Sequence, residues 1–186
     1  MLSLGSTAWE LVEAAAQASQ KPRTETATTV LKALPQFKVK EVSTLAATVT
    51  RNRRSAVNYD GSRKITTKQL FAILDKTLPY PDSSLFNVLP DLDQIDLLLF
   101  IFLVQDLAPG PYFFIRNEAH LPPLKSATRP EYHWKKIHTG GPLYQLVEGD
   151  FRIQAIDACC FQEIAGFSAF SLGMIAPLHK VVKTAP

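Results

Sequence analysis

Hydrophobic positions in this chain repeat with a helical period in several segments. In residues 41–52 and 66–78 they recur every three or four positions, which predicts two amphipathic helices. Residues 8–18 have compatible spacing and many good helix formers, so a third helix is predicted there. Asp150 can cap a further helix that extends to residue 164. Helices are therefore expected on both sides of the central part of the chain.

Strand signals lie between and after these helices. Residues 95–105 are almost wholly apolar and rich in branched and aromatic side chains, which is typical of a central strand buried on both faces. After the turn residues of 106–111, residues 112–116 predict an antiparallel hairpin partner. Residues 143–147 predict a third strand, and 169–176 fit either a strand or the start of a buried helix. This order indicates an α+β fold with a central antiparallel or mixed sheet flanked by helices.

Two segments interrupt these patterns. Residues 19–37 are polar and rich in threonine, as expected of a linker, so we divide the chain into an amino-terminal helix and linker arm, 1–38, and a domain, 39–186. Residues 120–142 contain four of the 13 prolines, and we expect an irregular surface excursion there. With 46% hydrophobic and 20% charged residues, the composition is that of a globular protein.

Composition and charge exclude several classes of protein. The longest purely apolar run, residues 97–104, is far shorter than the roughly 18 residues of a membrane-spanning helix. The first residues lack the pattern of a secretory signal, and adjacent Cys159 and Cys160 are expected to be small buried side chains in a reducing compartment. A net charge of +3 is too small to indicate nucleic-acid binding. We expect a cytoplasmic protein without a membrane or nucleic-acid partner.

The sharpest local chemistry is a cluster of arginines. Arg51, Arg53 and Arg54 precede the hydroxyl of Ser55, and forked guanidinium donors beside a hydroxyl suit a phosphate group. Equally, cations at the carboxyl end of a helix offset its macrodipole, which stabilises by about 0.3–1 kcal/mol. The residues alone leave both interpretations open.

Other candidate sites are weaker. His133 and His138 are accompanied by no cysteine or carboxylate cluster, so no metal site is predicted. Trp134 with Lys135 and Lys136 could stack on a nucleobase, but this pattern is more typical of an ordinary surface loop. No side chain stands out as a catalytic acid or base.

Several segments together resemble a known superfamily. RRSAVNYDG, followed by the TTKQLFAIL helix, is similar to the amino-terminal phosphate motif of the FMN-dependent nitroreductases. The strand LLLFIFLV, the turn DLAPGPYFFIRNEAHLPPL and the late EGDFRIQAIDACCFQEIAGFSAFSLGMIA resemble the SagB-type dehydrogenase branch and, more closely, tandem nitroreductase-like proteins with two halves in one chain. The resemblance covers most of the chain and implies a partial copy: a connector followed by the amino-terminal part of the second half.

The resemblance also implies a function. Arg53, Arg54 and Ser55 would hold the phosphate and ribityl end of FMN in an oxidoreductase that takes hydride equivalents from a nicotinamide donor. Sites of this family form between two halves, so the expected partner is an identical copy or a complementary nitroreductase-like half. The family's carboxy-terminal region is missing, and we expect a truncated or split form of a longer protein.

One departure from the family supports an alternative. Val57 stands where the family usually has another arginine or lysine near the flavin ring. A degenerate, non-catalytic half that supports a partner chain is therefore the second hypothesis. Nucleic-acid binding through the arginine cluster is a third, and it predicts an affinity that falls steeply with salt.

Overall fold

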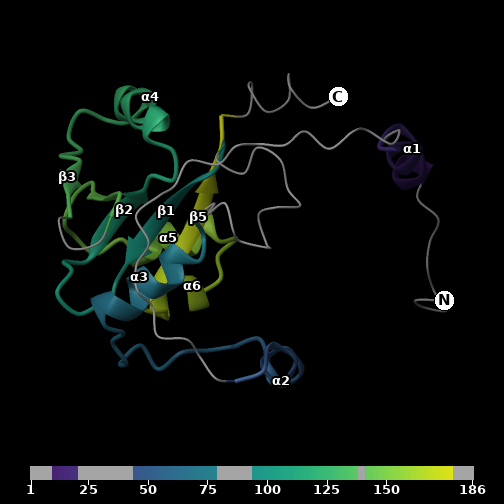
Figure 1. The fold of residues 1–186 in the computed structure, drawn as a ribbon, viewed down its shortest axis with the longest axis horizontal. Helices are drawn as coiled ribbons and strands as arrows, with labels where there is room; N and C mark the ends of the chain where they lie inside the picture. The colour runs from purple at the N-terminus through teal and green to yellow at the C-terminus, as the bar shows by residue number, and fades with distance from the viewer. Residues whose placement is uncertain (1–9, 21–43, 79–93, 138–140, 178–186) are drawn as a thin grey trace.

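The computed structural model describes residues 10–20, 44–78, 94–137 and 141–177 (Figure 1). Its strands are β1 (Asp96–Ile101), β2 (Gly110–Phe114), β3 (Lys135–Lys136), β4 (Leu143–Gln145) and β5 (Phe170–Ile175). Its helices are α1 (Glu10–Ala18), α2 (Ala46–Asn52), α3 (Thr67–Asp75), the 3-10 turn η2 (Glu118–His120), α4 (Leu121–Ala127), α5 (Arg152–Ala158) and α6 (Ile164–Phe167). The strands form one sheet in the order β3-β4-β2-β1-β5, with every neighbouring pair antiparallel. The predicted α+β class is confirmed.

The predicted hairpin forms the middle of the sheet. β1 pairs with β2 from Leu97 opposite Phe114 to Ile101 opposite Gly110, and on its other edge it pairs with β5. The segment after residue 168 is thus a strand, which settles the two alternatives left by its sequence. All five residues of β2 are buried, as expected for an apolar strand inside a sheet.

One face of the sheet is covered by α3. The helix begins with a capping box, in which the Gln69 backbone N–H donates to the Thr66 hydroxyl and the Gln69 side chain accepts from the Thr66 backbone N–H. Its buried stripe packs on β1 and β2 in a core that includes Leu70, Leu74, Leu99, Tyr112 and Phe114. The predicted apolar stripe of this helix is therefore the main covering of the sheet.

The opposite face carries a second, smaller core. Phe113, Ile115, Trp134 and Leu146 are buried there, with side chains of α4 packed against them. The prediction of an irregular surface excursion over 120–142 is wrong in part, because this segment contains α4 and β3. The prediction of an ordinary surface loop is wrong for Trp134, which is only 8% exposed. Its ring stacks on Phe113 at 5.1 Å between centroids.

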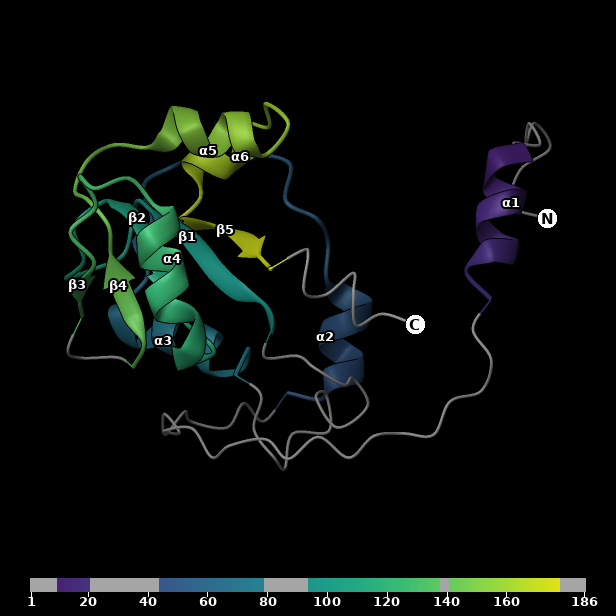
Figure 2. The same ribbon diagram turned by 90° about the horizontal axis from the view of Figure 1, so that it is seen from above.

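The helix predicted over 150–164 is wrong in its extent, because only α5 lies within it and α6 begins at its last residue. α5 ends before Cys160 and Phe161, whose φ values of 56° and 61° are incompatible with a right-handed helix. Cys160 is exposed and Cys159 partly buried, so the prediction of two buried thiols is wrong for Cys160. Seen from above, α5 and α6 lie across the sheet from α3 (Figure 2).

The first two helices contribute little to either core. The predicted helix over 8–18 is present as α1, and its residues 11–18 are all exposed. The helix predicted over 41–52 is shorter, since α2 begins at Ala46, and it has no buried residue. Residues 41–43 and most of the predicted linker lie outside the described residues. In the described ranges, no helix is long and apolar enough to cross a bilayer.

Candidate functional site

The arginine cluster lies on an exposed part of the chain. Arg51 is in the last turn of α2, Arg53 caps its carboxyl end, and Arg54 and Ser55 follow in extended backbone. Arg54 donates from Nη1 to the carbonyl oxygens of Arg51 at 3.0 Å and Arg53 at 2.9 Å. The Arg54 guanidinium thus satisfies carbonyl groups at the end of its own helix, as the macrodipole interpretation expects.

These residues do not by themselves make a complete flavin site. Arg53, Arg54 and Ser55 have the right donors for a phosphate, but all three are exposed. A bound cofactor normally has most of its surface covered by protein. Val57, close to the expected flavin position, is 91% exposed. These three residues therefore suit the phosphate end of FMN chemically, and the described part of the chain leaves them uncovered.

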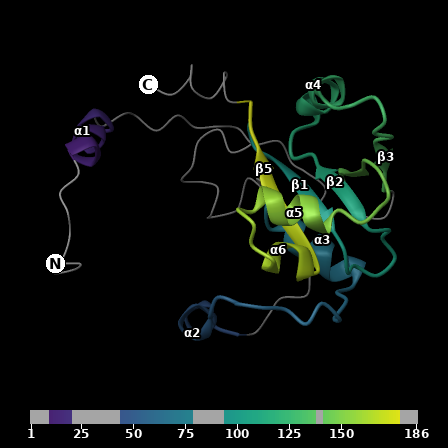
Figure 3. The same ribbon diagram turned by 180° about the vertical axis from the view of Figure 1, so that it is seen from behind.

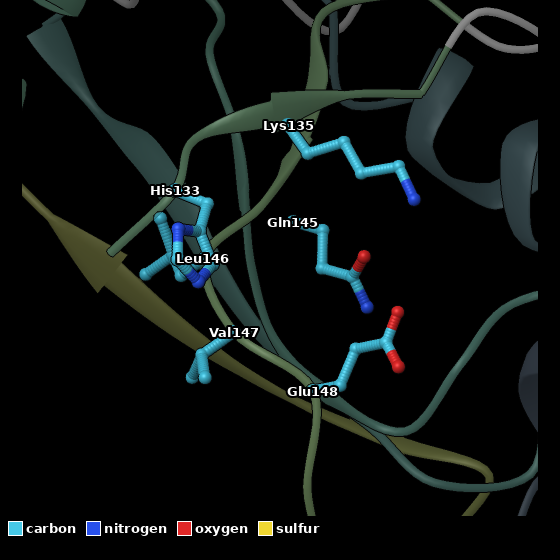
Figure 4. Close-up of a pocket in the computed structure, with 6 residues that line it drawn as sticks. All are labelled: His133, Lys135, Gln145, Leu146, Val147 and Glu148. Atoms are coloured by element: carbon cyan, nitrogen blue, oxygen red, sulfur yellow. The ribbon is translucent and has the colours of Figure 1, made fainter. Parts of the chain in front are cut away.

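A pocket lies elsewhere, at the β3–β4 end of the sheet (Figure 4). We call it the hairpin pocket. It has a volume of ≈ 410 Å³ and is lined by His133, Lys135, Gln145, Leu146, Val147 and Glu148. The pocket combines an apolar wall with a cation, an amide, an imidazole and a carboxylate. Gln145 and Glu148 were not predicted as site residues, although a glutamine between apolar neighbours in LYQLV indicates a polar group at a core position.

Tyr112 connects this pocket with the core. It lies directly opposite Gln145 in the β2–β4 pairing, and its hydroxyl donates to the Ala108 carbonyl at 2.7 Å. Burial, together with the nearby negative charge of Glu148, raises the pKa of Tyr112 to about 12. The phenol is therefore a hydrogen-bond donor at neutral pH and not a proton-transfer group.

The raised pKa of Tyr112 predicts a pH-dependent stability. The folded protein holds this proton more tightly than the unfolded chain, whose tyrosines titrate near 10. The free energy of unfolding should have its full Tyr112 contribution below pH 10 and lose it as the pH rises toward 12. Urea titrations of the wild type and Tyr112→Phe across this range test this. An identical pH slope in both proteins would contradict the assignment.

A close backbone approach shapes the same region. Gly110 has a φ of 149°, and a Cβ atom placed on it would lie 2.2 Å from the Val147 carbonyl oxygen. No side chain can be accommodated there, so glycine lets β2 start directly against the segment that follows β4. This contact fixes the position of Val147 and Glu148 at the pocket.

A buried polar network lies at the other end of the hairpin. The Asp96 carboxylate accepts from the backbone N–H of Arg116 at 2.7 Å and contacts His120 Nδ1, also at 2.7 Å. The Arg116 guanidinium donates to the carbonyls of Thr77 at 2.7 Å and Ile95 at 2.9 Å. Its contacts join β1, β2 and the end of the α3 segment, which is a structural role.

Clusters of metal-ligating side chains are absent from the described ranges. There, no group of three or more His, Cys, Asp or Glu side chains could hold a metal ion. His133 lines the hairpin pocket, whereas His138 lies outside the described residues.

Comparison with solved structures gives the architecture a precedent. A 1.80 Å crystal structure of an Anabaena variabilis protein, provisionally described as a nitroreductase, superposes with a TM-score of 0.51 over 73% of this chain. The fold is nitroreductase-like. The sequence identity is 22%, so the likeness concerns the fold alone, and this chain spans 24% of that protein. No family model matches the chain, and no curated protein does so either.

Proposed function

We propose that this chain supplies one part of an FMN-dependent oxidoreductase whose flavin site is completed by a second polypeptide surface. The nitroreductase-like fold is the observation that carries the proposal. The second surface would be an identical copy or a complementary nitroreductase-like half. When bound, FMN would supply the redox chemistry, with a nicotinamide as hydride donor and an activity of the SagB-type dehydrogenase class.

The exposure of the arginine segment supports a flavin site that is completed by a second polypeptide surface. Arg53, Arg54 and Ser55 are all exposed, as a phosphate-binding segment would be before a second surface covers it. Neither Arg53 nor Arg54 forms a salt bridge with any described carboxylate. Both guanidiniums can therefore engage a phosphate, although Arg54 must exchange its two bonds to backbone carbonyls for it.

The β5 edge of the sheet also supports association with a second polypeptide surface. In the described sheet β5 is the last strand, and Figure 3 shows it across the sheet from β3. Leu172, Met174 and Ile175 of this strand are 42%, 71% and 37% exposed. Exposed apolar side chains on an unpaired strand edge are typical of a surface that associates with another chain.

Titration of FMN into the full chain tests the phosphate ligands. The flavin fluorescence is followed at increasing protein concentration, with and without the complementary half. We expect the double variant Arg53→Ala/Arg54→Ala to bind FMN at least about 100-fold more weakly, because each charge-assisted hydrogen bond contributes about 1.5–3 kcal/mol. Arg63→Ala, an exposed arginine ten positions after Arg53, is the matched control. Equal FMN binding by the double variant and the control would refute the proposed ligands.

A non-catalytic scaffold is the second candidate, and two observations favour it. Val57 is exposed where the family has a cation, and the Arg54 guanidinium is engaged by its own backbone. A scaffold half would associate equally with and without FMN and would bind none of it. Sedimentation velocity with absorbance in the flavin band separates the two, since the flavin of a functional half co-sediments with the protein.

A further inference from the structure

The side-chain amide of Gln145 is buried in the sheet with one unsatisfied donor. Gln145 and Leu143 project to the same face of β4, and they are 4% and 0% exposed. The Gln145 Nε2 atom is buried without a hydrogen-bond partner. A buried donor left unpaired is unfavourable and uncommon in native proteins. A ligand that supplies an acceptor to this Nε2 atom would therefore be bound favourably.

Opposite charges flank this amide. Lys135 lies directly across from Gln145 in the β3–β4 pairing, and Glu148 follows three positions later in the chain. Both charged side chains are exposed, whereas Leu146 is buried in the second core on the other face of the sheet. Figure 4 shows the Lys135 amine, the Gln145 amide and the Glu148 carboxylate extending toward the same side of the hairpin pocket.

We propose that the hairpin pocket binds a small zwitterion of the amino-acid type. Its carboxylate pairs with the Lys135 ammonium and accepts from the Gln145 amide, and its ammonium group pairs with the Glu148 carboxylate. This site is separate from the arginine segment and does not depend on flavin binding.

Charge balance favours a zwitterion over a simple ion. A plain carboxylate would meet the negative charge of Glu148, and a plain amine would meet the positive charge of Lys135. Because Lys135 and Glu148 are exposed, their ion pairs are screened by water, and we expect a dissociation constant on the order of 1 mM. The volume of ≈ 410 Å³ is within the usual range of small-molecule sites. Since Gln145 Nε2 is buried, the ligand reaches it only when one of the exposed side chains beside it, Lys135 or Glu148, changes its rotamer.

Three probes of matched shape test the proposal on the full chain. L-leucine carries both charges, 4-methylpentanoate lacks the ammonium group, and 3-methylbutylamine lacks the carboxylate. The side-chain amide signal of Gln145 in ¹H–¹⁵N spectra reports binding. We expect L-leucine to shift this signal and to bind at least about tenfold more tightly than either half-probe. Equal binding of 4-methylpentanoate, or no shift with L-leucine in the millimolar range, would overturn the proposal.

Variants of the lining residues test each contact. Gln145→Leu and Lys135→Gln should each weaken L-leucine binding at least about tenfold, and Glu148→Gln should abolish the preference for L-leucine over 4-methylpentanoate. Lys136→Gln is the control, because its exposed side chain lies over the Tyr144 ring at 5.9 Å and does not line the pocket. If Gln145→Leu does not fold, L-leucine binding by Lys135→Gln still tests the proposal, because Lys135 is exposed and its replacement leaves the core intact. Unchanged binding in Lys135→Gln would refute the assignment.

Discussion

Replacing Asp96 with alanine should lower the free energy of unfolding by about 3 kcal/mol or more. The side chain is 2% exposed, and its two oxygens contact the Arg116 backbone N–H and the His120 ring. Alanine would leave the largely buried Arg116 N–H and the partly buried His120 ring without this acceptor. Urea denaturation at pH 7, followed by far-UV circular dichroism, measures the loss.

An exposed aspartate provides the control for this variant. Asp157 lies on the solvent side of α5, and Asp157→Ala should change the free energy of unfolding by no more than about 0.5 kcal/mol. Similar losses in the two variants would mean that the Asp96 network contributes nothing beyond an ordinary surface carboxylate.

Replacing Trp134 with alanine should be at least as damaging, with a loss of about 3–5 kcal/mol. The indole is stacked on Phe113 with 4° between the ring planes, and its Nε1 donates to the Thr128 hydroxyl at 3.0 Å. Removing it opens a cavity between β2 and the loop that holds α4. The unfolding free energy is measured by urea titration with far-UV detection, because the variant lacks the indole whose fluorescence would report on this core, and Trp9 lies outside the described residues.

Trp134→Phe separates stacking from hydrogen bonding. Phenylalanine keeps the aromatic contact with Phe113 and loses the bond to Thr128, so we expect a smaller loss, about 1–2 kcal/mol. A loss below about 1 kcal/mol in Trp134→Ala would show that this second core is not needed for stability.

The sequence predicted the elements whose signals are local. The apolar run at 95–105, the turn after it and the partner strand define β1 and β2, and the stripe and cap of α3 are visible in TTKQLFAILDKTL. The break between α5 and α6 was not predictable, because Cys160 and Phe161 adopt positive φ values that sequence patterns assign to glycine or asparagine. The burial of Trp134 depends on Phe113, a partner 21 positions away that no local pattern identifies.

For the candidate sites too, the sequence indicates local chemistry but not contacts between distant segments. The residue types of Arg53, Arg54 and Ser55 indicate what they can bind, but a motif does not determine which surface lies opposite. The hairpin pocket is lined by other residues. The hairpin pocket arises from register. The β3–β4 pairing places Lys135 beside Gln145, and this pairing could not be read from a predicted irregular segment.

The sheet order has a consequence for synthesis on the ribosome. Ile101 of β1 pairs with Gly110 on one side but with Phe170 on the other, so its second neighbour is made about 70 residues later. At translation rates of roughly 5–20 residues per second, this edge of β1 waits about 4–14 s for its partner. During that interval the nascent hairpin presents an apolar, unpaired strand, which is the form of the chain that chaperones recognise.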